Sequence, residues 1–572
     1  MHTRSYIKGY PRPMLTRDQW INLEGKWKFI FDDDNIGKNE EWYKSFPSNH
    51  QDIVVPYSYH TKNSLVHDTT YHPFMWYKTE LSIKKNDNEK TVLHFEAVDH
   101  YCEVYINGNL VGKHIGGYNR FSFDITSFVE KTANDLIIYV EDDMSKEKPR
   151  GKQRYKKENF ECWYVETSGI WKTPWIETVP QTYIEDTKYT FGGESLLFQT
   201  NVIGSDGTEK IKLTIFDEDI TLVNQFISSS ECITLNKEIK YWSHLDPKLY
   251  DIELEIIKDN KVIDHVKSYI GFRTIDYSTT DFKINDKSTY LKMILDQGYF
   301  NENHLTAFEY DIVQDLKLIQ EMGFNGIRKH EKIESSIYNY YCDIFGIYNW
   351  QEMPSPYFFT EKAKENFTNE WIETVNQYYN HPSIITWVPF NESWGIFDVL
   401  TNKEEQIFTL DIYNITKKLD LTRPVVSNDG WEHTQSDIIT LHNYAEYGEG
   451  LYNTYGDIKK ILNNESTNPE PPKKAFAEGF SYEGQPIMLT EFGGIAFSDD
   501  EGWGYGNAVQ SVEDFIKRLE SQMLSIKKMD FFKGYCLTQL TDVQQEVNGV
   551  LKEDRTPKIP ISEMKRLNNL FD

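Results

Sequence analysis

Two glutamates that follow apolar runs are the residues of this sequence with the clearest capacity for chemistry. Glu392 follows the run 384–390, and Glu491 follows the run 486–490. Each run reads as a strand buried on both faces, and a glutamate is rarely buried without a partner or a task. Hydrolysis of a glycosidic bond needs two opposed carboxylates, one as acid and base and the other as nucleophile or as base for a water.

The surroundings of the two glutamates predict how these roles divide. Glu392 stands between Trp387 and Trp394, and a carboxyl group beside indoles is expected to have a raised pKa, which suits an acid/base. Glu491 is then expected to be the nucleophile, which needs hydrogen-bond donors to stay ionised. We expect these donors at the ends of two other strands: Tyr444 and Arg328.

A wider set of polar and aromatic residues near strand ends is predicted to bind substrate. Asn391 is expected to bond the sugar 2-OH, a contact that strengthens in the transition state. The histidines of the set favour hydroxyl binding over core packing, and its tryptophans either stack on a sugar or pack in the core. No third ligand accompanies the histidines, so no metal site is predicted. The expected substrate-binding residues are Asn391, Tyr444, Arg328, His330, Asp296, Trp394, Trp431, His442 and Gln539.

The region 276–572 must position these side chains, and its pattern alternates strands with helices. Eight strands in this region favour a (β/α)8 TIM barrel over an open doubly wound sheet. The active site of such a barrel lies at the carboxyl ends of the strands, where Glu392 after the fourth strand faces Glu491 on the seventh. The expected strands are 291–296, 324–328, 347–352, 384–391, 425–428, 438–444, 487–491 and 534–540, and the expected helices are 310–322, 361–379, 403–418 and 512–528.

Residues 1–180 and 181–275 show short alternating segments broken by turns, which predict two β-sandwiches ahead of the barrel. Asn107-Gly108 between two such segments is a strong hairpin signal. We expect the first sandwich to be a jelly roll and the second to be immunoglobulin-like. The predicted fold class is therefore multidomain, with two β-sandwiches followed by a catalytic (β/α)8 barrel. Loops of the first domain cannot be placed at the pocket from sequence.

Composition restricts the partners and the compartment. Lys and Arg number 61 against 89 Asp and Glu, a net charge of −28, which argues against nucleic acid or an anionic membrane as partner. Five cysteines without CxxC spacing predict neither a disulfide framework nor a zinc site. The N-terminus has no apolar signal core and no segment approaches a membrane span, so a cytoplasmic location is expected unless a leader was removed. We expect a small carbohydrate or glycoside as substrate and no cofactor, and we leave a homo-oligomer open.

The chain resembles glycoside hydrolase family 2, the group of β-galactosidases, β-glucuronidases and β-mannosidases. The resemblance covers nearly the whole length, and its motifs are specific together although each is weak alone. It implies a sugar-binding jelly roll, an immunoglobulin-like sandwich and a catalytic barrel, with Glu392 as acid/base, Glu491 as nucleophile and net retention of configuration. The motifs are 168–175 (SGIWKTPW), 271–275 (GFRTI), 325–330 (NGIRKH), 390–395 (FNESWG) and 490–494 (TEFGG).

The sugar is predicted from departures from the family's patterns. Glucuronidases of the family grip the sugar carboxylate with an Asn-x-Lys, and here the corresponding positions carry Glu546 and Asn548, so a uronate would be repelled. The large β-galactosidases hold magnesium through a Glu and a later His, whereas Glu352 is followed by Met353-Pro354. We expect a retaining exo-β-glycosidase that resembles a β-galactosidase. The alternatives are a β-glucuronidase or other family 2 β-glycosidase, and a carbohydrate-binding protein that has lost turnover.

Overall fold

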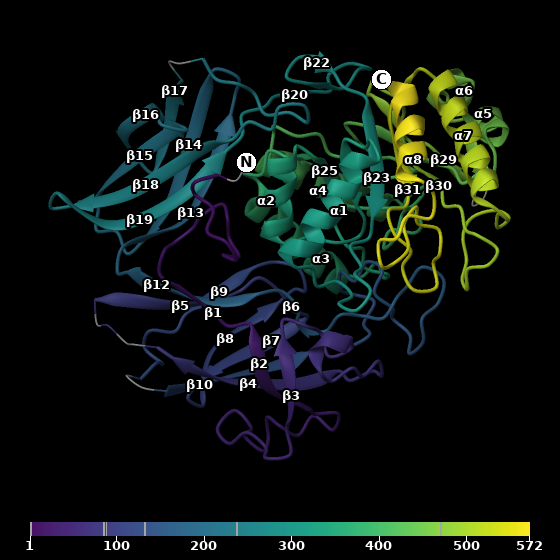
Figure 1. Ribbon diagram of the computed structural model, residues 1–572. Coiled ribbons are helices and arrows are strands. Elements are labelled where there is room, and N and C mark those ends of the chain that lie inside the picture. The colour runs from purple at the N-terminus through teal and green to yellow at the C-terminus, as the bar shows by residue number, and fades with distance from the viewer. Residues whose placement is uncertain (1–2, 84–85, 87, 131–132, 236–237, 470–471) are drawn as a thin grey trace.

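The computed structural model describes residues 3–83, 86, 88–130, 133–235, 238–469 and 472–572. Two β-sandwiches are followed by a barrel of parallel strands and helices, which confirms the predicted fold class. In Figure 1 the first sandwich, coloured purple to blue, lies at the bottom, the second at the upper left, and the barrel, coloured teal to yellow, to the right. The N-terminal segment runs between the second sandwich and the barrel, where Tyr6 stacks on Tyr340 of the barrel at 4.4 Å.

The first sandwich packs a six-stranded sheet, in the order β3-β2-β4-β10-β7-β8, on a four-stranded sheet, β1-β12-β5-β9. The Asn107-Gly108 hairpin is confirmed, since both residues have positive φ (49° and 77°) and join the paired strands β7 and β8. The elements are β1 Trp20–Asn22, β2 Gly25–Phe31, β3 Gln51–Val55, η1 Lys62–Ser64, β4 Phe74–Ser82, β5 Glu89–Phe95, β6 Val98–Asp99, β7 Tyr101–Ile106, β8 Asn109–Ile115, β9 Phe121–Asp124, β10 Ala133–Glu141, β11 Gly169–Ile170 and β12 Pro174–Pro180.

The second sandwich packs a three-stranded sheet, β13-β14-β17, on a four-stranded sheet, β16-β15-β18-β19. Its strands alternate buried and less buried residues because each sheet has one face on the core, as β18 shows from Tyr250 to Ile256. The elements are β13 Tyr183–Phe191, β14 Ser195–Ile203, β15 Lys210–Asp217, β16 Ile220–Ile227, β17 Ser230–Thr234, β18 Tyr250–Lys258 and β19 Lys261–Ile270.

The barrel strands are buried along nearly their whole length, as the apolar runs predicted. Their hydrogen-bonded order is β26-β25-β24-β23-β31-β30-β27. The small sheet β20-β21-β22 precedes the first barrel strand. The elements are β20 Ile275–Asp276, β21 Lys283–Ile284, β22 Lys287–Ser288, β23 Leu291–Asp296, β24 Gly326–Lys329, β25 Tyr348–Glu352, β26 Ile384–Val388, β27 Ile439–His442, β28 Thr467–Pro469, β29 Pro472–Lys474, β30 Ile487–Gly493 and β31 Phe532–Thr538.

The structure corrects two of the expected barrel strands. The expected strand 425–428 lies beside β26 but makes only isolated bridges, from Trp387 to Val425 and from Asn391 to Asp429. Its ladder is interrupted because the Val425 N–H donates to the carboxylate of Asp437 and not to a neighbouring strand. The expected strand 384–391 ends at Val388, because the next residue is Pro389, which has no N–H to donate.

Helices cover the barrel and follow their predicted ranges to within about two residues. The four predicted helices correspond to α1, α3, α4 and α7, which confirms them. None of the helices in the described part of the chain combines the length and apolarity needed to cross a membrane. The helices are α1 Glu309–Glu321, α2 Ser336–Phe345, α3 Glu361–Tyr378, α4 Lys403–Leu419, α5 Gly448–Tyr455, α6 Ile458–Leu462, α7 Val512–Lys528, α8 Ile561–Asn568 and η2 Asn569–Phe571.

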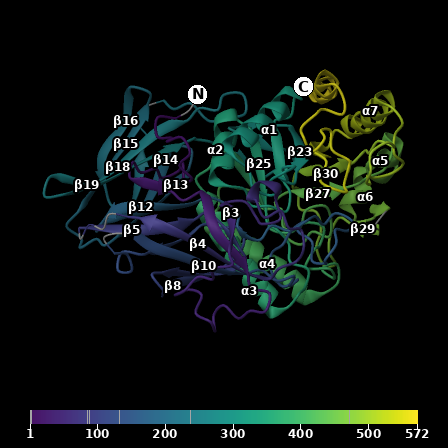
Figure 2. The ribbon, with the colours of Figure 1, turned by 60° about the horizontal axis from the view of Figure 1, so that its bottom comes forward.

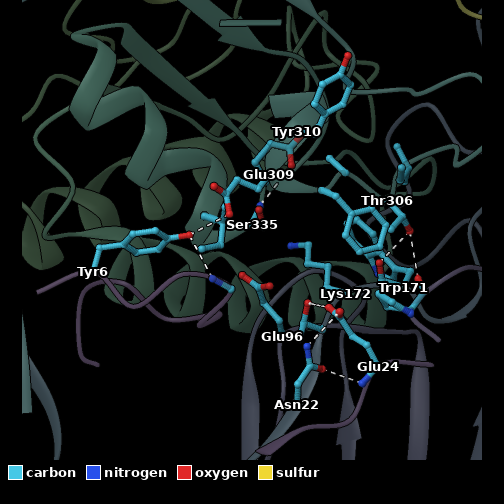
Figure 3. A pocket seen from close by; sticks show the side chains of 18 residues that line it. Tyr6, Asn22, Glu24, Glu96, Trp171, Lys172, Thr306, Glu309, Tyr310 and Ser335 are labelled. Carbon is cyan, nitrogen blue, oxygen red and sulfur yellow. Dashed lines mark hydrogen bonds between the residues drawn. The ribbon is translucent and has the colours of Figure 1, made fainter. Parts of the chain in front are cut away.

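The first sandwich docks against the barrel beside α3 and α4 (Figure 2). The Asn119 side chain donates to the carbonyl of Glu370 in α3 at 2.7 Å, and the Tyr118 N–H donates to the Glu370 carboxylate at 2.8 Å. A cavity of about 250 Å³ remains between these two domains (Figure 3). Its wall includes Lys172, which donates to the carbonyls of Tyr118 and Ile333 and so ties the two domains together.

The second sandwich is tied to the barrel by Arg273. This buried guanidinium donates to the carbonyls of Pro382 at 2.6 Å and Ile384 at 2.7 Å, at the start of β26. We expect R273A to lower the free energy of unfolding by about 2–4 kcal/mol, because the buried Pro382 carbonyl loses its charged donor and the Ile384 carbonyl is left with the donor Arg423. Chemical denaturation measures the effect, with R566A on the exposed face of α8 as control. A loss no larger than that of R566A would contradict this role.

Candidate active site

A cavity of about 480 Å³ opens at the carboxyl ends of the barrel strands and contains both glutamates that the sequence singled out. Residues from the barrel and from the first domain line it together. The lining residues are Lys152, Glu161, Cys162, Trp163, Leu295, Gln297, His330, Glu392, Trp394, Tyr444, Glu491, Trp503, Tyr505, Thr538 and Glu546.

The two glutamates face each other at short range. A carboxylate oxygen of Glu392 lies within 4.8 Å of a carboxylate oxygen of Glu491. The carboxyl groups of retaining glycosidases are about 5–5.5 Å apart, whereas inverting enzymes leave about 6.5–9.5 Å for a water between them. The side chain of Glu392 is 19% exposed and that of Glu491 5%, so the former is the more open to a ligand entering the cavity. The spacing suits attack by one carboxylate on a bond that the other protonates.

Glu392 is held in an unusual backbone conformation. Its φ is +51° and that of Ser393 is +62°, values that residues with a side chain rarely adopt. The Glu392 N–H donates to the carbonyl of Asp429 and the Ser393 N–H to the side chain of Asn428, both at 2.9 Å. Strained conformations of this kind persist where the surroundings over-determine them, and they cluster at functional sites.

Glu491 receives a donor on each carboxylate oxygen. Arg328 donates from Nη1 to Oε1 at 2.7 Å, and the Tyr444 hydroxyl donates to Oε2. These are the two residues from which the sequence predicted donors. A donor on each oxygen fixes the position of the carboxylate, as attack by a nucleophile requires.

Arg328 organises the buried base of the site. Besides Glu491, its guanidinium contacts the carboxylates of Glu352 at 2.7 Å and Asp429 at 2.8 Å, and it donates to the Asn391 oxygen at 2.6 Å. Burial lowers the pKa of Arg328, but these three carboxylates outweigh it and raise the pKa well above its usual range. The guanidinium therefore stays charged and fixes the orientation of Asn391.

His442 lies between the two glutamates and changes the expected state of Glu392. Its Nδ1 is 2.8 Å from Glu392 and 3.5 Å from Glu491, and its Nε2 is 3.2 Å from Asp429. Burial lowers the pKa of His442, but the charges of Glu491 and Asp429 and the hydrogen bonds to Asp429 and Glu392 raise it to about 10. The imidazole is therefore protonated at neutral pH.

The predicted raised pKa of Glu392 is wrong. Burial does raise the pKa, but the hydrogen bond and charge of His442 outweigh it, and the pKa is lowered. Nor does Trp387 lie beside Glu392, since its indole donates to Asp420 at 2.8 Å and packs edge-on against Trp371 of α3. Because successive side chains of a strand point to opposite faces, Trp387 belongs to the helix layer. His442 and Glu392 share one proton across the neutral range.

Glu392, His442 and Glu491 also form a group whose ligand atoms lie close enough to hold a metal ion. Each of these residues already takes part in a hydrogen bond with another member of the group or with Arg328 or Tyr444. We therefore interpret the group as a proton-sharing cluster. Glu352 stands where the large β-galactosidases of the family hold magnesium. Here its carboxylate accepts from Arg328 and from the Glu331 N–H at 3.0 Å.

The proton shared by His442 and Glu392 predicts a pH dependence. The imidazolium lowers the pKa of Glu392, so H442N, which is neutral, leaves burial as the main influence and raises that pKa. In the wild type the pair keeps its shared proton up to the raised pKa of His442, about 10. In H442N Glu392 must hold the proton alone, so we expect the alkaline limb of the kcat/KM profile to move to lower pH. Profiles of H442N and wild type on one substrate measure it. A limb that stays in place or moves to higher pH would contradict this interpretation of the cluster.

Six of the nine expected substrate-binding residues do not line the cavity, and three of these six are held by other parts of the protein. Asp296 pairs with Lys329 at 2.7 Å and accepts from the Gly298 N–H, because a buried carboxylate needs such partners. Gln539 is held between Gln297 and Asn548. Trp431 packs edge-on against His442 at 5.5 Å and therefore supports the site from behind.

The other expected residues lie in the cavity wall or directly behind it. His330, Trp394 and Tyr444 line it, while Arg328 and His442 contact the glutamates from the buried side. Asn391 is buried, and its Nδ2 has no hydrogen-bond partner among the residues that the structure describes. A buried amide donor beside Glu392 is free for a ligand oxygen, which fits the expected contact with a sugar 2-OH.

The sequence did not reveal the residues that distant loops bring to the cavity. Lys152 and Trp163 come from the loop between β10 and β11 of the first domain, and Trp503 and Tyr505 from the loop after β30. Tyr505 stacks on Tyr444 with ring centroids 3.4 Å apart. Both loops are rich in aromatic residues, but this composition does not predict where a loop lies in the fold.

Fold and site together define a protein with paired carboxylates at the mouth of a TIM barrel, preceded by two β-sandwiches. Three family models match in this order: "Glycosyl hydrolases family 2, sugar binding domain" over residues 21–172, "Glycosyl hydrolases family 2" over 182–273, and "Glycosyl hydrolases family 2, TIM barrel domain" over 276–572. The chain belongs to glycosyl hydrolases family 2. The resemblance predicted from the motifs is thereby confirmed.

Relatives in the family are distant. A Formosa agariphila protein provisionally named a β-glucuronidase is 26% identical over 78% of this chain and 55% of its own length. A Thermoanaerobacter pseudethanolicus β-galactosidase is 24% identical over 85% of this chain and 64% of its own. The chain thus spans less than two thirds of the length of both. The crystal structure of Ruminococcus gnavus β-glucuronidase has a TM-score of 0.80 at 19% identity, covers 98% of this chain and 99% of that one, and shows a shared fold.

Proposed function

We propose that the protein is a retaining exo-β-glycosidase that removes a terminal β-linked sugar by double displacement. The observation that carries this proposal is the pair of carboxylates with oxygens within 4.8 Å of each other in one cavity. That spacing is near the about 5–5.5 Å of retaining enzymes. The cavity volume of about 480 Å³ is modest for a ligand site, which suits a terminal sugar better than a long chain.

In the first step Glu491 attacks the anomeric carbon while the glycosidic oxygen takes a proton from Glu392. The C–O bond to the leaving group breaks, and a glycosyl ester of Glu491 forms. Arg328 and Tyr444 donate to the attacking carboxylate and orient it. The proton delivered to the leaving group is the one that Glu392 shares with His442.

In the second step Glu392 takes a proton from water, and the water oxygen attacks the anomeric carbon of the ester. Glu491 leaves as carboxylate, and the sugar departs with its original configuration. The free Nδ2 of Asn391 is positioned to donate to the sugar 2-OH, and the oxocarbenium-like transition state strengthens this contact.

The first candidate sugar is a β-glucuronide. Relatives named β-glucuronidases support it, including the Rattus norvegicus enzyme, 23% identical over 86% of this chain and 80% of its own length. The second candidate is a β-galactoside, which the galactosidase relative and Glu546 support. Glu546 lines the cavity where its charge would repel a uronate, although Tyr164 and Asn548 donate to its carboxylate.

A screen of nitrophenyl β-glycosides tests the proposal. We expect release from the β-glucuronide or the β-galactoside, with the β-anomer as the first sugar product by NMR. An α-anomer appearing first would contradict retention. No release from any sugar would favour the alternative of a carbohydrate-binding protein without turnover.

A further inference from the structure

The first domain supplies a buried cation to the active-site cavity. Lys152, on the loop between β10 and β11, is 8% exposed and lines the cavity together with the two glutamates. The neighbouring residues fix the loop to the barrel, since the N–H groups of Arg150 and Gly151 donate to the Ser355 carbonyl at 3.1 and 3.2 Å. The position of Lys152 is therefore set by the docking of two domains.

The hydrogen bonding of Lys152 differs from that of the other buried lysines. Six lysines are buried in the described part of the chain. Five of them donate to carboxylate or carbonyl oxygens within the protein: Lys148, Lys172, Lys329, Lys332 and Lys558. Figure 3 shows Lys172, whose ammonium lies between the first domain and the barrel. The ammonium of Lys152 has one protein acceptor among the described residues, the sulfur of Cys162 at 3.4 Å.

Cys162 does not neutralise this ammonium. Burial raises the pKa of its thiol to about 12, so the sulfur is uncharged and a weak acceptor. Burial opposes the charge of Lys152, whereas the charges of Glu331, Glu392 and Glu546 favour it, although within the described residues no carboxylate oxygen lies within 4.0 Å of its Nζ. The rings of Trp163 and Trp394 lie 5.7 and 5.8 Å away. A desolvated cation without an ion pair is unfavourable unless it serves a ligand.

We propose that Lys152 is the specificity residue of the cavity and binds the carboxylate of a terminal β-linked uronic acid. The inference rests on the proposed function, because it names the substrate class of the same site. An ammonium that faces the cavity and has spare donors matches a carboxylate best, since a charge-assisted hydrogen bond is about twice as strong as a neutral one. Glucuronidases of the family bind the sugar carboxylate with an Asn-x-Lys of the barrel, which this chain lacks. Lys152 of the first domain would bind the carboxylate in its place.

Glu546 is compatible with this assignment because its carboxylate is held by the protein. Tyr164 donates to Oε2, Asn548 donates to Oε1 at 3.0 Å, and Gln297 lies 3.5 Å from Oε2. Burial also raises the pKa of Glu546, which weakens its repulsion of a second carboxylate. Lys152 and these donors together can accommodate two acidic groups in one pocket.

The test compares K152M with wild type on the nitrophenyl β-glucuronide and β-galactoside. K157M, at an exposed position of the same loop, is the matched control. We expect K152M to lose roughly 100-fold in kcat/KM on the glucuronide, while its activity on the galactoside stays within a few fold. K152R should recover part of the glucuronide activity. Equal losses on both sugars, or a wild type that cleaves only the galactoside, would overturn the assignment.

Two measurements without turnover separate this inference from the proposed function. Calorimetry with free D-glucuronate should show binding to wild type and K157M but not to K152M, even if no glycoside is cleaved. The Tm of K152M should stay close to that of wild type, because Lys152 has no ion pair within 4.0 Å among the described residues to lose. A clear fall in Tm would show that Lys152 is structural, and equal glucuronate binding by K152M would refute the carboxylate contact.

Discussion

Replacing Glu491 by Gln is expected to abolish turnover, with kcat falling by roughly 10⁴-fold or more. The amide cannot form the glycosyl ester, and no other carboxylate takes its place, because Glu392 is held by His442 on the opposite side of the cavity. The substitution preserves the volume of the side chain. Its amide oxygen can still accept from Arg328, and the Tyr444 hydroxyl can turn to accept from the amide N–H, so the fold should be unaffected. Single-turnover and steady-state assays on the preferred nitrophenyl glycoside measure the loss.

The control for this substitution is E404Q, an exposed position in the first turn of α4. It should match wild type in rate and in Tm. If E491Q kept more than about a tenth of the wild-type kcat, Glu491 would not be the nucleophile. If the Tm of E491Q fell sharply, the activity would be measured again with E491D. This variant keeps the carboxylate but places it farther from the anomeric carbon, and it should also lose turnover.

Replacing Glu392 by Gln is expected to have an effect that depends on the leaving group. General acid and base catalysis contributes about 10²–10⁴-fold, and a nitrophenolate leaves without full protonation whereas an alkoxide does not. The first step should therefore be nearly normal for an activated aglycone and slow for an alkyl glycoside. The second step, which needs the base, should be slow for both aglycones. With the activated aglycone, whose first step stays fast, the ester then accumulates and KM falls together with kcat.

Added azide distinguishes this role from a structural one. Azide needs no general base, so it should restore turnover of the nitrophenyl substrate by E392Q and give a glycosyl azide of retained configuration. It should not restore E491Q. Equal losses for both aglycones without azide rescue would contradict the assignment of Glu392 as acid/base.

The sequence alone predicted the barrel and predicted that its two glutamates share one cavity. The apolar runs before Glu392 and Glu491 are continuous because a parallel barrel strand is buried on both faces, and this pattern is legible without tertiary information. Once the strands are counted, barrel geometry places the fourth and seventh ends opposite each other. The donors Arg328 and Tyr444 followed from the same count. The prediction that Asp296 and Gln539 bind substrate was wrong, because other side chains already hydrogen-bond them. A position at a strand end does not reveal such partners.

The electrostatics of the site and its outer wall could not be predicted from sequence. The pKa of Glu392 depends on His442, which is fifty residues away in the chain and becomes charged only because Asp429 and Glu491 surround it. Lys152 reaches the cavity because the first sandwich docks beside α3, and no local pattern encodes that docking. Local pattern fixes strands and helices, whereas contacts between domains decide which loops enclose the substrate.

Covalent trapping of the glycosyl-enzyme tests the central claim most directly. The reagent is a 2-deoxy-2-fluoro glycosyl fluoride of the sugar that the enzyme cleaves. The fluorine at C2 destabilises the oxocarbenium-like transition states of both steps, but the good leaving group at C1 still lets the ester form. The ester therefore accumulates because its hydrolysis is slow. After proteolysis, mass spectrometry should find the label on the peptide that carries Glu491, and E491Q should remain unlabelled. A label on Glu392 or on another residue, or active enzyme that never becomes labelled, would contradict the double-displacement pair.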